Sequence, residues 1–145
     1  MREVTALYLT FALADVCRPH QRFALAGAQV AQILPPTALV SVPLAPTAVC
    51  GILNLRGRLV TVVDPAPLLG QPAQAHTLAT AGAHILILEP GGADRRSSLG
   101  LWVAQLLGTQ AALPESPGPL QIINLEAMMQ QLGRLFTRPH AQGAT

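Results

Sequence analysis

The sequence predicts an all-β domain followed by one C-terminal helix. Short apolar runs rich in Val, Ile and Leu are separated by Pro and Gly along most of the chain, which is typical of β proteins. Two such runs flank Arg56 and Gly57, as the strands of a hairpin flank its turn. Helical periodicity appears over 125–136, where apolar residues recur at intervals of three and four.

The composition fits a single folded domain that meets partners. A chain of 145 residues has the usual length of one domain. Half of its residues are apolar and 3% are aromatic, so the core must be aliphatic. Charged residues make up 11%, well below the usual quarter, and a surface so poor in charge favours association. A net charge of +2 on isolated positions does not predict a nucleic-acid surface.

In the first half, the sequence predicts strands between Pro and Gly residues. They are expected at 6–13, 22–26, 30–34, 39–42, 51–55 and 58–63. One helical turn is expected over 46–50, with Pro46 at its start. Asp64 should cap a second short turn that begins at Pro65 and ends at Gly70.

In the second half, residues 71–83 are expected to link two halves of the domain. A second hairpin should follow, with strands at 84–89 and 99–107 and an exposed loop at 90–98. The last strand is expected at 120–124. The helix over 125–136 should bury one side, formed by Leu125, Met128, Met129, Leu132 and Phe136. The tail at 139–145 is predicted to be disordered.

The first hairpin resembles the signature of the CheW-like domain, the adaptor fold of bacterial chemosensory arrays. The resemblance rests on Gly51-Ile-Leu-Asn-Leu-Arg-Gly57 and on the apolar strand that ends at Asp64. Pro43 and Pro46 fall where the family has prolines, and Val30 and Ile33 occupy its valine and isoleucine positions. The resemblance implies two small SH3-like five-stranded β-barrels side by side. It also implies a non-enzymatic adaptor that couples the cytoplasmic tip of a chemoreceptor to the regulatory domain of a CheA-type histidine kinase.

The resemblance also assigns candidate site residues. The predicted partner-binding residues are Val30, Gln32, Ile33, Arg56 and Arg58. The predicted structural turn residues are Gly51, Asn54, Gly57 and Asp64. Gln32 stands where many family members have Glu, which removes a charge from the expected surface.

The sequence around Arg56 and Val30 allows predictions about both side chains. No charged residue lies between Arg22 and Arg56, so the isolated guanidinium needs a role. It either pins neighbouring carbonyls or Asp64, or it contacts a protein partner. Strand alternation places Val30 and Gln32 on one face, which we expect to be exposed, and Ile33 on the other.

No pattern in the sequence points to catalysis. The carboxylates are scattered, the four histidines lack ligand spacing, and no nucleophile motif is present. We therefore expect neither an enzyme nor a metal or other cofactor. Cys17 and Cys50 are predicted to be reduced structural thiols. No apolar run reaches the ~20 residues of a membrane helix and no targeting segment is convincing, so we expect a cytoplasmic protein without membrane insertion, located at receptor arrays.

Two other functions fit the same residues. An adaptor of a pilus-motility or other chemosensory-like pathway would have this fold with a different receptor. A small-molecule-binding β-barrel, or an enzyme of unrecognised type, would need a pocket lined by convergent polar groups, and the few polar residues of this chain argue against such a pocket.

The segment 108–119 predicts a shortened second barrel. It contains Pro114, Pro117 and Pro119, and it is shorter than the corresponding segment of most CheW-like domains. Because proline is largely confined to sheet edges and loops, we expect no regular strand here. An open edge invites pairing with a second copy, so a homodimer is one predicted state.

Overall fold

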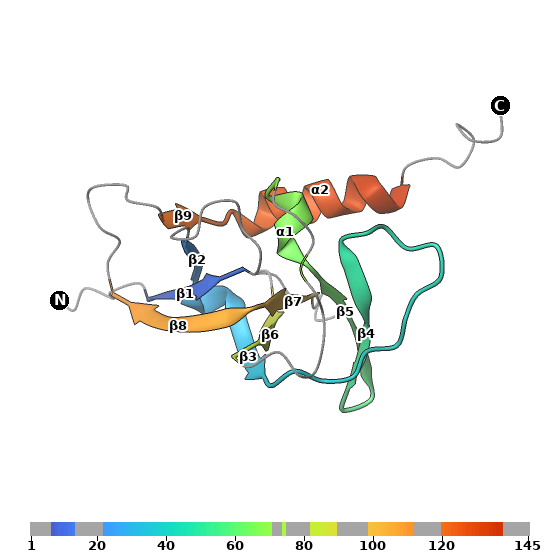
Figure 1. Cartoon of the computed structure of the whole chain (residues 1–145), viewed down its shortest axis with the longest axis horizontal. Coiled ribbons are helices and arrows are strands. Elements are labelled where there is room, and N and C mark those ends of the chain that lie inside the picture. Colours follow the sequence, from blue (N-terminus) through green and yellow to red (C-terminus); the bar gives the residue numbers. More distant parts are fainter. Residues whose placement is uncertain are drawn as a thin grey trace.

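Two β-sheets share a main core cluster, and a helix covers one side of it (Figure 1). The computed structural model describes residues 7–13, 22–70, 74, 82–89, 99–111 and 120–137. The helices are α1 (Pro65–Leu68) and α2 (Leu125–Thr137), with a 3-10 turn at Gly27–Gln29. The predicted all-β fold with a C-terminal helix is confirmed.

The first and last strands of the chain form a four-stranded sheet. Its order is β8 (Gln105–Gln110), β1 (Tyr8–Ala12), β2 (Arg22–Ala26) and β9 (Leu120–Ile122). β1 runs antiparallel to both neighbours, whereas β9 runs parallel to β2. In the part of the chain that the structure describes, β8 and β9 each pair with one strand, so the predicted homodimer through an open edge stays a prediction.

The middle strands form a five-stranded sheet. Its order is β3 (Val30–Leu34), β6 (His84–Leu88), β7 (Leu99–Val103), β5 (Arg58–Val63) and β4 (Val49–Leu55). Both predicted hairpins are present, as the antiparallel pairs β4–β5 and β6–β7. β5 also pairs with β7, and β3 with β6, so the segment 71–83 connects strands of one sheet and does not separate the two sheets.

The strand predicted at 99–107 is in fact two strands in different sheets. The chain bends at Ala104, whose N–H donates to the carbonyl of Ala12 at 3.1 Å, and β8 then pairs with β1. β8 extends to Gln110, so the prediction of no regular strand over 108–119 is wrong for 108–110. The rest of the proline-rich segment, 112–119, lies outside the described residues.

Two other local predictions were wrong in part. The helical turn predicted at 46–50 is a shorter turn, in which the Val49 N–H donates to the Pro46 carbonyl at 2.9 Å, because Val49 and Cys50 already belong to β4. The strand predicted at 39–42 is reduced to a single bridge between Val40 and Ile52. In both places the conformation of the segment depends on its pairing with a neighbouring strand.

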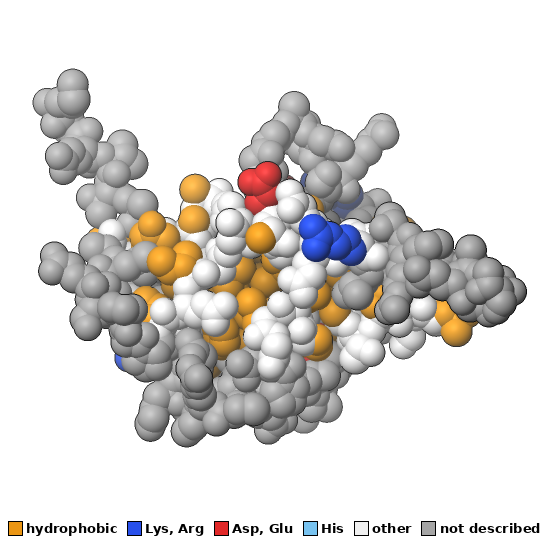
Figure 2. All heavy atoms as spheres, turned by 90° about the horizontal axis from the view of Figure 1, so that it is seen from above, with side chains coloured by type: hydrophobic (Ala, Val, Ile, Leu, Met, Phe, Trp, Pro, Cys, Tyr) orange, Lys and Arg blue, Asp and Glu red, His pale blue; other side chains and the backbone are white. Residues whose placement is uncertain are grey.

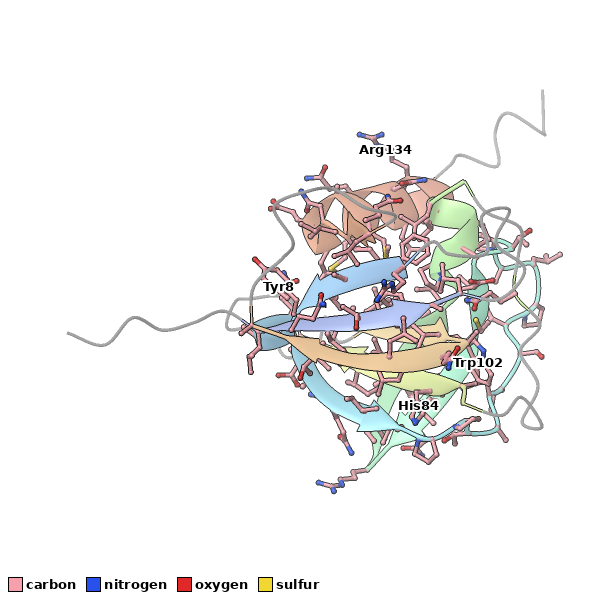
Figure 3. The ribbon with its side chains drawn as sticks, turned by 60° about the vertical axis from the view of Figure 1, so that its left-hand side comes forward. Tyr8, His84, Trp102 and Arg134 are labelled. Atoms are coloured by element: carbon pink, nitrogen blue, oxygen red, sulfur yellow. The ribbon has the colours of Figure 1, made fainter. Side chains whose placement is uncertain are left out.

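The core divides into two clusters because successive side chains of a strand point to opposite faces. Along β6, Leu86 and Leu88 belong to the main cluster, and Ile85 and Ile87 to the second cluster. Burial of both faces explains why four consecutive residues of β6 are large and aliphatic. Trp102, labelled in Figure 3, is 1% exposed and belongs to the second cluster.

The main cluster is shared by both sheets and both helices. In α2, Leu125, Met128 and Leu132 are buried as predicted and Met129 is half-buried. The side chain of Phe136 and the tail 139–145 lie outside the described residues. Figure 2, which looks down on the α2 side, shows apolar patches with few charged groups between them. Neither described helix has the length and hydropathy needed to cross a bilayer.

Candidate partner-binding surface

The tip of the β4–β5 hairpin is a two-residue turn, and its first residue, Arg56, is of a type that is unusual there. Leu55 pairs with Arg58, and the two residues between them have positive φ, +53° for Arg56 and +84° for Gly57. This is the sign pattern of a type I′ turn, which Asn and Gly prefer. The side-chain oxygen of Asn54 accepts the Gly57 N–H at 2.9 Å. Asn54 and Gly57 thus have clear roles in the turn, whereas Arg56 lies in a conformation that strains its own backbone.

The side chain of Arg56 is exposed. Within the described residues its guanidinium makes no hydrogen bond or ion pair. Asp64 lies beyond the opposite end of β5, about 20 Å away at 3.3 Å per residue. The interpretation in which Arg56 pins Asp64 is therefore wrong.

Two exposed apolar side chains lie along one face of the hairpin whose tip carries Arg56. Val40 lies opposite Ile52, and Leu59 lies opposite Asn54. Because positions 52 and 54 share a face, so do Val40 and Leu59, which are 70% and 71% exposed. We call Val40, Arg56 and Leu59 the hairpin surface.

Arg58, the second predicted arginine, has a partner. Its Nη2 lies 3.5 Å from Oε1 of Glu89, and the side chains are 40% and 45% exposed. At this distance and exposure the ion pair is weak. It links β5 to the end of β6 at the protein surface.

A bulge in β3 corrects the predicted faces. Val30 pairs with Leu88, but Gln32 pairs with Ile87, so Ala31 is an extra residue in the ladder. Ile33 then lies opposite Leu86, on the same face as Val30. Alternation had predicted the reverse, with Gln32 beside Val30.

Exposure in β3 also differs from the prediction. Val30 is half-buried against the main cluster, whereas Ile33 is 42% exposed. We call Val30 and Ile33 the β3 surface. It lies on the edge of the sheet opposite β4, so the predicted residues form two separate surfaces.

Asp64 lies at the base of the hairpin and is fully buried. Its carboxylate accepts the Ala66 N–H at 2.9 Å, which confirms the predicted helix cap. It also accepts both the backbone N–H and the side-chain amide of Gln74, at 2.7 and 2.6 Å. Nothing in the sequence singled out Gln74, because a glutamine in a low-complexity connection has no distinguishing pattern.

Two further residues at the base depend on close packing. A Cβ on Gly51 would approach the carbonyl oxygen of Val40 to 2.7 Å, so only glycine fits. Cys50 is a free thiol at the bulge where Val49 and Gly51 pair with Val63 and Val62. Burial, with the negative charge of Asp64, raises the pKa of the Cys50 thiol well above its usual value. It therefore remains protonated, which agrees with a structural role.

Among the described residues, no group of three or more His, Cys, Asp or Glu side chains is placed to hold a metal ion.

Comparison with known proteins agrees with the resemblance in the sequence. The sequence model of the CheW-like domain matches residues 8–137. The crystal structure of the scaffolding protein TtCheW from Thermoanaerobacter tengcongensis is similar, with a TM-score of 0.60 and 20% identity. The match covers 74% of this chain and 66% of that chain, and at this identity it shows the fold alone. No curated protein matches this chain by sequence.

Proposed function

Because this chain belongs to the CheW-like domain family, we propose that it is a non-enzymatic scaffold that couples a chemoreceptor to a CheA-type histidine kinase. It would work in the cytoplasm, at membrane-associated receptor arrays. The coupling is geometric, with no bond made or broken. The protein would act as a rigid body that holds the receptor and the kinase in a fixed relative position. A displacement of the receptor would then shift the equilibrium between active and inactive states of the kinase.

Arg56 is the observation that supports this proposal most strongly. A non-glycine residue in the left-handed region costs about 1–2 kcal/mol, and Asn or Gly would fill the same turn with less strain. An arginine kept there, exposed and with no bond to a described residue, is better explained by a contact outside the chain. Arginine is also enriched at the energetic centres of protein interfaces.

Two separate surfaces suit a scaffold with two partners. The hairpin surface and the β3 surface lie on opposite edges of one sheet. The hairpin surface has two exposed apolar side chains, Val40 and Leu59, and the β3 surface has one, Ile33. We assign the β3 surface to the receptor tip. The hairpin surface is then free for the second partner, the kinase regulatory domain.

The proposal is tested by measuring binding of the purified protein to the receptor tip and to the kinase regulatory domain of its own organism. Ile33→Asp should weaken receptor binding at least tenfold, because a carboxylate at a desolvated contact costs about 1.4 kcal/mol or more. The matched control is Ile122→Asp, which makes the same change on β9 at an isoleucine that is 52% exposed.

The outcomes separate the candidate functions. Equal loss from Ile33→Asp and Ile122→Asp would contradict the assignment of the β3 surface. Binding to neither receptor nor kinase would contradict the coupling function. Binding only to the receptor of a pilus-motility system would favour that pathway instead. Val30→Asp is a poorer test, because Val30 packs against the main cluster and the variant would also lose stability.

A further inference from the structure

The loop between β3 and β4 carries the most exposed large apolar side chain among the described residues. Leu44 is 100% exposed, whereas the next in order, Leu59 and Val40, are 71% and 70% exposed. Because a leucine stabilises a fold only by leaving water, this side chain contributes no burial to the domain. Figure 1 shows that the loop, drawn in teal, extends beyond β4 at the edge of the molecule.

The backbone of Leu44 is strained as well. The Ala45 N–H donates to the Val42 carbonyl at 3.3 Å, which closes a turn around Pro43 and Leu44. Proline fixes its own φ at about −65°. Leu44 follows with a φ of +61°, which is the sign pattern of a type II turn, where glycine or asparagine is preferred. Among the non-glycine residues that the structure describes, only Leu44 and Arg56 have a positive φ.

The loop that presents Leu44 is anchored at both ends. On one side, Val40 and Ile52 exchange two backbone hydrogen bonds, at 2.9 and 2.8 Å. On the other side, the carbonyl of Ala48, which is 1% exposed, accepts the N–H of Asp64 at 2.6 Å. A side chain presented by such a preorganised loop loses less conformational entropy on binding than one on a free segment.

The charges around the turn define the chemistry of its partner. No Asp or Glu occurs between Asp15 and Asp64, so neither this loop nor the strands of the hairpin contain an acidic side chain. They contain two basic residues: Arg56, which is exposed at the far end of β4, and Arg58, which forms the weak ion pair described above. Apolar anchors beside a positive charge are complementary to an apolar pocket with acidic groups near it.

We propose that the Leu44 turn, formed by residues 42–45, is an anchor that inserts into an apolar pocket of the kinase regulatory domain. This contact rests on the proposed function and deepens it, because the turn lies on the β4 edge with the hairpin surface, away from the β3 surface. β4 has seven residues and is about 20 Å long. One partner face of ordinary size, about 800 Å², can therefore cover both Leu44 and Arg56.

The test measures binding of the kinase regulatory domain by titration calorimetry and stability of the same variants by urea unfolding. Leu44→Asn removes the apolar side chain and introduces a residue that the turn prefers. Its affinity should fall at least about tenfold, because the burial of a leucine is lost. Its urea midpoint should stay equal or rise, because asparagine tolerates the left-handed conformation. Leu44→Met keeps an apolar side chain and should bind within about threefold of the parent protein.

Further measurements locate the contact and its chemistry. Leu107→Asn makes the same change on β8, in the other sheet, at a leucine that is 41% exposed, and should alter binding by less than about twofold. Leu44→Asn should likewise leave receptor binding unchanged. Higher salt should weaken binding of the kinase domain to the parent protein and preserve the difference from Leu44→Asn, because the anchor is apolar and its surroundings are charged.

The outcomes distinguish failure of the anchor from failure of the proposed function. If the parent protein binds the kinase domain and Leu44→Asn binds it equally well, the anchor is refuted and the proposed function stands. If the parent protein does not bind the kinase domain, both fail.

Other results would overturn particular parts of the proposal. A lower urea midpoint for Leu44→Asn would show that Leu44 is structural. Loss of receptor binding in Leu44→Asn, or parent dimers that this variant converts to monomers in light scattering, would mean that a different partner covers the turn. Binding of the kinase domain that does not depend on salt would contradict the acidic groups.

Discussion

The base and the tip of the β4–β5 hairpin contrast in almost every physical respect. At the base, Asp64 is fully buried and all its described bonds are internal. At the tip, Arg56 is exposed and has no described bond. Gly51 has no room for a Cβ, whereas Gly57 has no atom within 4 Å of one.

The contrast teaches that one sequence signature serves two purposes. The residues at the base satisfy buried polar groups and close packing, so their substitution should cost stability. The strained arginine at the tip contributes little to packing, so its substitution should cost partner binding. The following predictions test that division.

The largest loss of stability is expected for Asp64→Ala. Three buried donors, on Ala66 and Gln74, would lose their acceptor, which should lower the free energy of unfolding by about 3 kcal/mol or more. Urea denaturation measures the change. Asp64→Asn keeps one acceptor oxygen and should lose less; an equal or larger loss would mean that the charge itself holds the network.

Substitution of Gly51 at the base and of Gly57 at the tip allows a direct comparison of the two regions. Gly51→Ala should destabilise by about 2–3 kcal/mol, because the new Cβ meets the Val40 backbone. Gly57→Ala should cost only about 1 kcal/mol, from its φ of +84°. Thermal and urea unfolding of both variants provide the measurement. Similar losses at both positions would remove the steric distinction between base and tip.

At the tip, Arg56→Ala should weaken binding to a partner by about 2 kcal/mol and change stability by under about 0.5 kcal/mol. Arg56→Gly should lose the same binding but gain up to about 1 kcal/mol of stability, because glycine relieves the left-handed strain. Titration calorimetry and urea unfolding measure the two effects. Arg134→Ala is the control, since this exposed arginine projects from α2 (Figure 3). Lower stability with unchanged binding would show that Arg56 is structural.

The smallest effect is expected for the ion pair beside the tip. Glu89→Gln removes the charge that Arg58 faces in this ion pair, but both side chains are well exposed and 3.5 Å apart. The free energy of unfolding should change by less than about 0.5 kcal/mol, and less still in high salt. A loss above 1 kcal/mol, measured by urea unfolding at low salt, would place this pair among the structural residues.

Much of the local structure was readable from the sequence because it depends on neighbouring residues. Strand 22–26, the hairpin turn at Arg56 and Gly57, and the cap at Asp64 all follow from local propensity and turn chemistry. The buried side of α2 was likewise predicted from spacing alone for Leu125, Met128 and Leu132.

The candidate site was less predictable, because it depends on pairing between distant strands. The bulge at Ala31 exchanges the faces of Gln32 and Ile33, and no local pattern marks it. The bend at Ala104 divides one apolar run between two sheets for the same reason.

By itself, the sequence determined the strand content, the hairpin and its turn, and the resemblance to the CheW-like family. All of these features depend on residues that lie close together in the sequence. Only the tertiary structure decided that Val30 and Ile33 share a face, that Arg56 lies apart from them, and that Gln74 fastens Asp64. Each of these relations joins segments far apart in the sequence. They depend on the folded chain as a whole, because both faces of a sheet must be covered and every buried polar group must find a hydrogen-bond partner.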